Sequence, residues 1–328
     1  MATFLTGATG FVGGHLARQL VERGDRVRCL VRAGSDRANL DGLPVEVVEG
    51  DLLDRRAVER AVRGCGQVFH CAADYRIYVP DPQRMYRVNV EGTRNVLRAA
   101  ADSGAERVVH TSSVGALGLL SGGRAADETV PVRIEAMIGP YKRSKFLAER
   151  VAEEWAAKGL PVVIVNPSTP IGEADRKPTA TGRMILDFLN RRVPVYVDTG
   201  LNLVDVRDVA RGHLLAAERG RIGEKYILGA ENLDLIDIYS RLGRIAGLAP
   251  PRLRVPLVVP WTAAVLGTGI ARVLGRTPPV AIDAVRMARH KMFFDSSKAR
   301  DALGYSPGSV DEALSRAAGW FRGHGYVR

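Results

Sequence analysis

Two residues suited to proton transfer lie four positions apart. Tyr141 and Lys145 fall on one face of an expected helix over 141–157, because side chains four apart on a helix are neighbours. A free tyrosine has a pKa near 10 and is a poor acid at neutral pH, but an adjacent ammonium favours the phenolate and lowers that pKa. Ser113 follows an expected strand, 107–111, where doubly wound folds present reacting groups. We therefore expect Tyr141 to transfer a proton while Ser113 holds a substrate oxygen.

A glycine-rich turn supplies the expected cofactor site. The sequence Thr6-Gly7-Ala8-Thr9-Gly10-Phe11-Val12-Gly13 joins a short apolar run to an amphipathic segment. Its glycines are three and three apart, not two and three as in the commoner dinucleotide fingerprint, but the physical roles are the same: a tight turn, close approach to a pyrophosphate and close helix–strand packing. Phosphate then meets the positive N-terminus of a helix. The turn predicts dinucleotide binding.

The end of the second expected strand, 27–31, bears on the choice between NAD and NADP. A carboxylate there would bind the ribose 2′-hydroxyl, whereas a cation would accept a 2′-phosphate. Arg32 and Arg37 occupy this region, and Asp36 lies four residues beyond Arg32. Guanidinium groups pair well with phosphate, so NADP(H) is favoured and NAD(H) is the alternative. Arg32 as a solvated turn residue also stays open.

Gly50-Asp51-Leu52 closes the third expected strand, and we count Asp51 and Leu52 among the cofactor-binding residues. Asp51 could accept a hydrogen bond from the adenine amino group. It could equally cap the helix that follows, and the two roles are compatible.

The first half of the chain alternates apolar runs with amphipathic segments, which is typical of a parallel sheet covered on both faces by helices. The expected strands are 2–5, 27–31, 45–49, 67–71, 107–111 and 162–166. The expected helices are 12–22, 55–62, 81–101 and 141–157. The pattern predicts an α/β fold with a doubly wound parallel sheet (Rossmann) and a smaller, mostly helical C-terminal substrate domain.

Prolines interrupt this alternation after residue 166. A strand near 203–206, a helix over 209–218 and a strand at 225–228 are expected to return to the main sheet. We therefore expect residues 1–168 plus 203–229 to form the dinucleotide-binding domain, and residues 169–202 plus 230–328 to form the substrate-binding domain.

The segment 255–275 is unusually apolar and has arginines on both sides, at positions 252, 254, 272 and 276. Its prolines and glycines make it a poor membrane-spanning helix. It is interpreted either as a core helix or lid over an apolar substrate, or as a monotopic membrane contact.

Composition narrows the class of protein. The 47 basic and 36 acidic residues give a net charge of +11, but the basic residues are scattered and only 6% of residues are aromatic. Without a basic stripe or a stacking platform, we expect no nucleic-acid partner. Three cysteines are too few for a disulfide framework, and no signal peptide or apolar run of about 18 residues is evident, so we expect a cytoplasmic location, with contact at the inner face of the membrane as the alternative. No second ligand pair accompanies His70 and Cys71, so no metal site is expected.

With these motifs the chain resembles the extended short-chain dehydrogenases/reductases. Within that family it is similar to the dihydroflavonol reductase-like branch, and most of all to the hopanoid-associated sugar epimerase group. The stretches that carry the resemblance are HCAADY at 70–75, NVEGT at 89–93, MIGPYKRSK at 137–145, NPSTPIG at 166–172 and YVDTGLNLV at 196–204.

The resemblance implies that Tyr141 is the acid–base residue and that Ser113 completes a triad. Tyr141 and Lys145 are also counted among the cofactor-binding residues, Lys145 through the nicotinamide ribose. The resemblance places four further residues beside the cofactor: Ala72, Ala73, Pro167 and Ser168. It gives Asn89 a structural role and lets Asp208 hold the small domain. Homodimers that pair through the helices at 81–101 and 141–157 are common in the family.

The function expected from these residues is NADP-dependent hydride transfer between nicotinamide and a carbonyl or secondary alcohol. The alternative is an NAD(P)-dependent sugar or sugar-nucleotide epimerase/dehydratase linked to hopanoid metabolism. A regulatory dinucleotide-binding protein is a third class, against which the intact triad counts. The partner is expected to be a small-molecule carbonyl, lipid or sugar. A substrate wall is expected from residues 75–78, Met85, Tyr86, Met184, Phe188 and Tyr196.

Overall fold

The computed structural model describes residues 2–79, 81–273 and 281–327. Its main sheet has seven parallel strands in the order β10-β6-β5-β4-β1-β2-β3. They are β1 (Ala2–Thr6), β2 (Arg26–Val31), β3 (Glu46–Glu49), β4 (Gln67–His70), β5 (Arg107–Thr111), β6 (Val162–Pro167) and β10 (Lys225–Leu228). The strand order reverses between β1 and β4, which is the switch point at which doubly wound folds bind their ligands.

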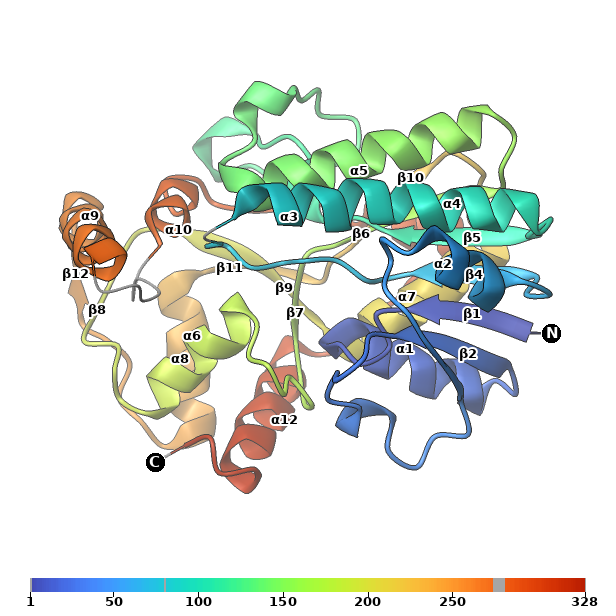
Figure 1. Cartoon of the computed structure of the whole chain (residues 1–328). Helices are drawn as coiled ribbons and strands as arrows, with labels where there is room; N and C mark the ends of the chain where they lie inside the picture. The colour runs from blue at the N-terminus through green and yellow to red at the C-terminus, as the bar shows by residue number, and fades with distance from the viewer. Residues whose placement is uncertain (1, 80, 274–280, 328) are drawn as a thin grey trace.

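Helices cover both faces of the main sheet (Figure 1). One face carries α1 (Phe11–Glu22) and α7 (Val206–Arg219), and the other carries α2 (Arg55–Val62), α4 (Gly92–Asp102) and α5 (Gly139–Ala157). Neighbouring residues of β1 show why both faces are apolar, since Leu5 packs into the first core and Phe4 into the second. The predicted Rossmann fold is confirmed.

The helix expected over 81–101 is not continuous. It consists of α3 (Pro82–Tyr86), a π-helical segment Arg87–Glu91, and α4. The π-helical segment carries Asn89, whose buried side chain bonds two neighbouring elements, and such bulges are frequent at functional sites.

The expectation that the strand near 203–206 rejoins the main sheet is wrong. That strand is β9 (Gly200–Asp205), the centre of a separate sheet in which it pairs with β7 (Thr169–Ile171) and β11 (Glu231–Asp234). Only Ser168 separates β6 from β7, so the chain leaves the main sheet there and its next strand binds β9 in parallel. β10 does rejoin the main sheet, beside β6.

The C-terminal part has a core of its own around α6 (Ala180–Leu189), α8 (Leu235–Ala246) and α12 (Val310–Gly323). A short pair, β8 (Val195–Tyr196) with β12 (Leu253–Arg254), precedes α9 (Val258–Val273) and α10 (Ile282–Met287). α11 (Ser297–Leu303) instead packs on α7 and β10, at the edge of the main sheet. None of the helices in the described part of the chain is long and apolar enough to cross a bilayer.

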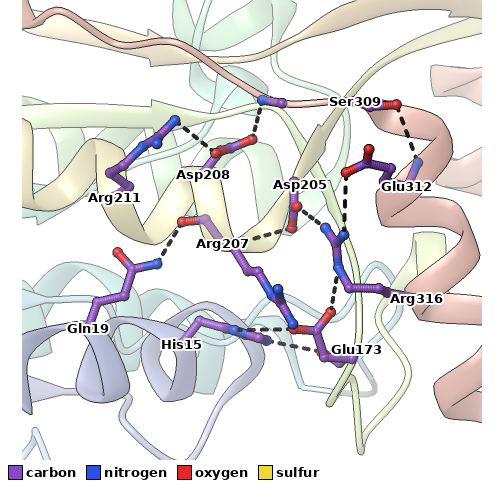
Figure 2. A network of polar contacts seen from close by, with 11 residues as sticks. His15, Gln19, Glu173, Asp205, Arg207, Asp208, Arg211, Ser309, Glu312 and Arg316 are labelled. Atoms are coloured by element: carbon purple, nitrogen blue, oxygen red, sulfur yellow. Dashed lines mark hydrogen bonds and ion pairs between the residues drawn. The ribbon is translucent and has the colours of Figure 1, made fainter. Parts of the chain in front are cut away.

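A polar network fixes the C-terminal part against the main sheet (Figure 2). Arg316 of α12 pairs with Asp205, which caps α7, and with Glu173 at 3.2 Å. Asp208 accepts a hydrogen bond from the Gly308 amide at 2.6 Å, which ties α7 to the segment before α12. The two parts are therefore held together by contacts between α7, α12 and the segment that leads into α12.

Candidate active site

A cavity of about 1100 Å³ opens at the carboxyl ends of the main-sheet strands, beneath the C-terminal part. It is lined by Thr6, Gly7, Thr9, Gly10, Phe11, Val12, Gly13, Arg32, Asp51, Leu52, Ala72, Ala73, Ser113, Tyr141, Lys145, Pro167 and Ser168. The structure thus brings together all the predicted site residues except one. Arg37 does not line the cavity; its guanidinium pairs with Glu49 at 3.3 Å.

The glycine-rich turn has the backbone geometry that a pyrophosphate site requires. Gly7 has a φ of +76°, in the left-handed region that glycine adopts without strain. A Cβ on Gly13 would collide with the Gly7 carbonyl, so only glycine lets α1 pack this closely on the turn. No side chain caps α1 at Gly10, which leaves the first-turn N–H groups to a phosphate. These residues fit a dinucleotide.

At the end of β2 the cavity continues into a smaller one of about 490 Å³. Three exposed cations from separate segments line it: Arg32 after β2, Arg84 of α3, and Lys177 before α6. Asp36 does not line either cavity and binds Arg176 at 3.4 Å. Arg84 and Lys177 were missed by the sequence reasoning, because nothing in their local sequence indicates that they meet Arg32.

Asp51 lines both cavities but does not cap α2. The cap is Asp54, whose carboxylate accepts from the Ala57 amide at 3.1 Å. The expectation that Asp51 caps this helix is wrong because the helix begins at Arg55, and Asp51 instead accepts from the Leu53 amide within its own turn, at 2.9 Å.

Ser113 and Tyr141 meet over Gly115. A Cβ built on Gly115 would lie 3.3 Å from Ser113 Oγ, 3.8 Å from Tyr141 Cε1 and 3.6 Å from Lys142 Cγ, so this glycine leaves room where the three side chains converge. Burial raises the pKa of Tyr141, and its hydrogen bond with Ser113 opposes part of that rise. Tyr141 is therefore a protonated phenol at neutral pH.

Lys145 lies one turn beyond Tyr141, and its ammonium donates to the Thr111 carbonyl at 2.6 Å. Burial lowers the pKa of Lys145 to about 8, while the negative charge of Glu149 raises it. The sequence led us to expect that Lys145 lowers the pKa of Tyr141. The net shift of the Tyr141 pKa is upward instead, because desolvation of the buried phenol dominates.

Glu149, one further turn along α5, is fully buried and was missed by the sequence reasoning. Its carboxylate accepts from Ser112 Oγ at 2.5 Å, Asn166 Nδ2 at 2.7 Å and Lys225 Nζ at 2.9 Å. Asn166 Nδ2 also donates to the Ser113 carbonyl at 3.1 Å. The network ties the backbone of Ser113 to the helix that carries Tyr141. In a helix rich in Arg and Glu, nothing in the sequence separates Glu149 from a solvated face.

Asn89 supports the site from the π-helical segment. Its Oδ1 accepts from the Asp74 amide at 2.7 Å, and its Nδ2 donates to Ser144 Oγ at 2.9 Å. Ser144 Oγ in turn donates to the Tyr141 carbonyl at 2.8 Å. Asn89 thus links the loop after β4 to the first turn of α5.

Only some of the residues predicted to form the substrate wall line the cavity. Tyr75, Arg76, Ile77 and Met184 line the cavity, whereas Met85 and Phe188 are buried elsewhere and Tyr78, Tyr86 and Tyr196 are not among the lining residues. The structure adds residues from the C-terminal part that the sequence reasoning missed: Leu257, Pro260, Ala284, Val285, Met287, Ala288, His290 and Met292. They lie more than 100 residues from Tyr141 in the sequence, so only the fold reveals them.

Lys142 also lines the cavity, beside Tyr141, and its side chain is buried. Its Nζ lies 3.8 Å from Met292 Sδ and pairs with no carboxylate of a described residue. Burial lowers the pKa of Lys142 to about 8.

Residues 3–229 match the NAD dependent epimerase/dehydratase family. The chain belongs to this family. It is 49% identical to a Synechocystis sp. protein whose name proposes a dihydroflavonol 4-reductase, over 99% of this chain and 96% of that one. It is 38% identical to sterol demethylase protein B of Methylococcus capsulatus, over the full length of both.

Among solved structures, that of gox2253 matches with a TM-score of 0.90 and 48% identity, over 100% of this chain and 99% of that one. The resemblance to extended short-chain dehydrogenases/reductases of the dihydroflavonol reductase-like branch is confirmed. As a member of the epimerase/dehydratase family the chain is a nicotinamide-dependent enzyme. The likeness to the hopanoid-associated epimerase group stays a prediction.

Proposed function

We propose that this enzyme is an NADPH-dependent reductase of an apolar carbonyl compound, with Ser113, Tyr141 and Lys145 at the reacting centre. The observation that carries the proposal is one continuous cavity. It holds these three residues at one end and a cluster of cations at the other, with the glycine-rich turn between them.

The cations support the choice of NADP(H). Arg32, Arg84 and Lys177 line the small cavity beside β2, and Arg37 pairs with Glu49, one of the two carboxylates that face them. A ribose 2′-phosphate would supply the negative charge that this cluster complements, whereas the 2′-hydroxyl of NAD would not.

Bound NADPH supplies the hydride. Ser113 holds the carbonyl oxygen through its hydroxyl, and Tyr141 donates the proton that the oxygen needs as it becomes an alcohol. The raised pKa of Tyr141 keeps its proton in place until then. The Lys145 ammonium, one helical turn away, stabilises the tyrosinate that remains. These roles favour reduction of a carbonyl as the productive direction.

The substrate end of the cavity supports an apolar compound. Its walls include Met184, Val285, Met287 and Met292, and flexible thioether side chains adapt to large apolar ligands. The names of the two relatives are also consistent with an apolar substrate, since one name refers to a dihydroflavonol 4-reductase and the other to a sterol. The alternative, an epimerase or dehydratase acting on a sugar nucleotide, is favoured by the family description.

The test is NADPH oxidation by the purified protein with a panel of lipid ketones, aromatic ketones and sugar nucleotides. We expect sustained oxidation with an apolar ketone. Tyr141→Phe should lower kcat by about 10²–10⁴-fold, the usual contribution of a positioned acid, and should change the Kd for NADPH far less. Tightly held NAD⁺ without net oxidation would instead establish the epimerase, and full activity of Tyr141→Phe would overturn both.

A further inference from the structure

Helix α9 turns its apolar side outward. Its exposed residues are Val258, Val259, Thr262, Ala263, Val265, Leu266, Gly269 and Ile270. They recur at the spacing of one helical face, and the largest are strongly exposed: Leu266 at 68%, Val258 at 61% and Ile270 at 60%. The inward positions Ala264 and Ala271 are small. In a surface helix of a globular protein the apolar stripe faces the core, so α9 has the opposite orientation.

Basic residues lie before this helix and beside it. Between positions 252 and 291 the sequence has seven basic residues and one acidic residue. Of the described side chains, Arg252 and Arg254 before α9 are exposed, as are Arg286 and Arg289 beside α10. Arg254 pairs with Asp198 at 2.7 Å and Arg286 with Asp283 at 3.5 Å, whereas Arg252 and Arg289 form no ion pair with a described residue. Arg286 and Arg289 place their guanidinium groups over the ring of Trp261, at 5.8 and 5.5 Å from its centroid. Figure 1 shows α9, β12 and α10 together at one end of the molecule.

The combination matches a helix that lies in a lipid–water interface. Such helices bury an apolar face in the lipid and carry Arg or Lys at its borders, where anionic headgroups attract them. A second copy of the chain is a poorer occupant, because pairing through α9 would bring the unpaired Arg252 and Arg289 of both copies together. Residues 274 and 275, the end of the apolar segment, and Arg276 lie outside the described residues.

The helix also borders the active-site cavity. Leu257 and Pro260, at the start of α9, line the cavity that contains Tyr141, as do Val285 and Ala288 of the α10 region. A face resting on a bilayer would therefore place the substrate end of the cavity next to the lipid.

We propose that the exposed face of α9 docks on an anionic lipid bilayer. The docking depends on surface chemistry alone and does not rest on the proposed reductase activity.

The test is sedimentation of the full-length protein with vesicles of phosphatidylcholine alone or mixed with phosphatidylglycerol. Wild type should bind the mixed vesicles well and the neutral ones weakly, and salt should weaken the binding because it screens the basic border. Leu266→Glu with Ile270→Glu should lower the partition coefficient by about tenfold or more, since two large apolar side chains are lost from the contact.

Ile222→Glu is the matched control. Ile222 is 55% exposed in the turn before β10, outside α9, so this variant should bind vesicles like wild type. NADPH binding and the melting temperature show whether each variant is folded. Two results would overturn the proposal. One is a wild-type protein that does not bind vesicles containing phosphatidylglycerol, and the other is a folded double variant that binds these vesicles as well as wild type does. A wild-type dimer that the double variant converts to monomer, without vesicle binding, would assign the face to a second copy.

Discussion

Replacing Glu149 by Gln tests whether the buried network under the active site acts as inferred. The Glu149 carboxylate is fully buried and accepts hydrogen bonds from Ser112 after β5, Asn166 of β6 and Lys225 of β10. An amide keeps the shape but loses the charge, and its NH₂ must face one of these donors. Loss of charge-assisted hydrogen bonds in a buried network costs about 2–4 kcal/mol.

This cost translates into a measurable change in melting temperature. A per-residue unfolding entropy of about 2.1 cal/mol/K gives about 0.7 kcal/mol/K for the chain, so Glu149→Gln should lower Tm by about 3–6 °C. Scanning calorimetry measures the shift. Glu153→Gln is the matched control: Glu153 lies one turn along α5 and also binds Lys225 at 2.9 Å, but it is 26% exposed, so its loss should cost about 1 kcal/mol or less.

The same variant should alter the pH dependence of activity. Lys145 is charged below its pKa of about 8 and loses its charge as the pH rises through that value, so activity should fall above it. Glu149 raises the pKa of Lys145, hence Glu149→Gln should move this alkaline limb to lower pH. If Glu149→Gln melts like Glu153→Gln and leaves the limb in place, the network does not support the site.

Two further predictions concern buried cations and imidazoles. Lys142→Met should lower kcat/KM about tenfold for a ketone that carries a carboxylate near the carbonyl, because the buried Lys142 ammonium has no carboxylate partner among the described residues. The methyl ester of the same ketone should be reduced equally well by the variant and by wild type. Steady-state kinetics with the two ketones measures the difference, and an equal loss of kcat/KM with both would contradict the prediction. Burial lowers the pKa of His70 to about 3 and that of His213 to about 4. At a pH below their ordinary pKa of 6.5, both side chains therefore take up a proton when the protein unfolds. The free energy of unfolding should therefore fall with acidification between pH 6 and 5, by about 1.2 kcal/mol for each histidine. Urea titrations at these pH values measure the slope, and an unchanged midpoint would refute it.

The main sheet and the glycine-rich turn were predictable because their signals are local. Strands covered on both faces form apolar runs, and the roles of Gly7 and Gly13 can be inferred from the spacing of glycines within one short turn. The partner of a strand is not local information. The pattern at 203–206 indicated a strand but could not show that β7 would bind it outside the main sheet.

The site was predictable where it follows strand ends and not where distant segments meet. Arg37 was included because it is near Arg32 in sequence, but its ion pair with Glu49 depends on the neighbouring strand β3. Arg84 and Lys177 reach the same cavity from α3 and from the loop before α6. Contacts between segments that are distant in the sequence arise from tertiary packing, which a single sequence does not reveal.

The most direct test of the proposed NADPH-dependent enzyme is the ratio of the Kd values for NADH and NADPH, measured by titrating the fluorescence of bound nicotinamide. Wild type should prefer NADPH by at least about tenfold, and Arg32→Ser should reduce that preference by about 10–100-fold, the worth of a hydrogen bond between charged groups. Arg176→Ser is the control and should change little, since Arg176 lies outside both cavities and pairs with Asp36, which also lies outside them. Equal affinity of wild type for NADH and NADPH, or an Arg32→Ser variant that weakens both alike, would contradict the account.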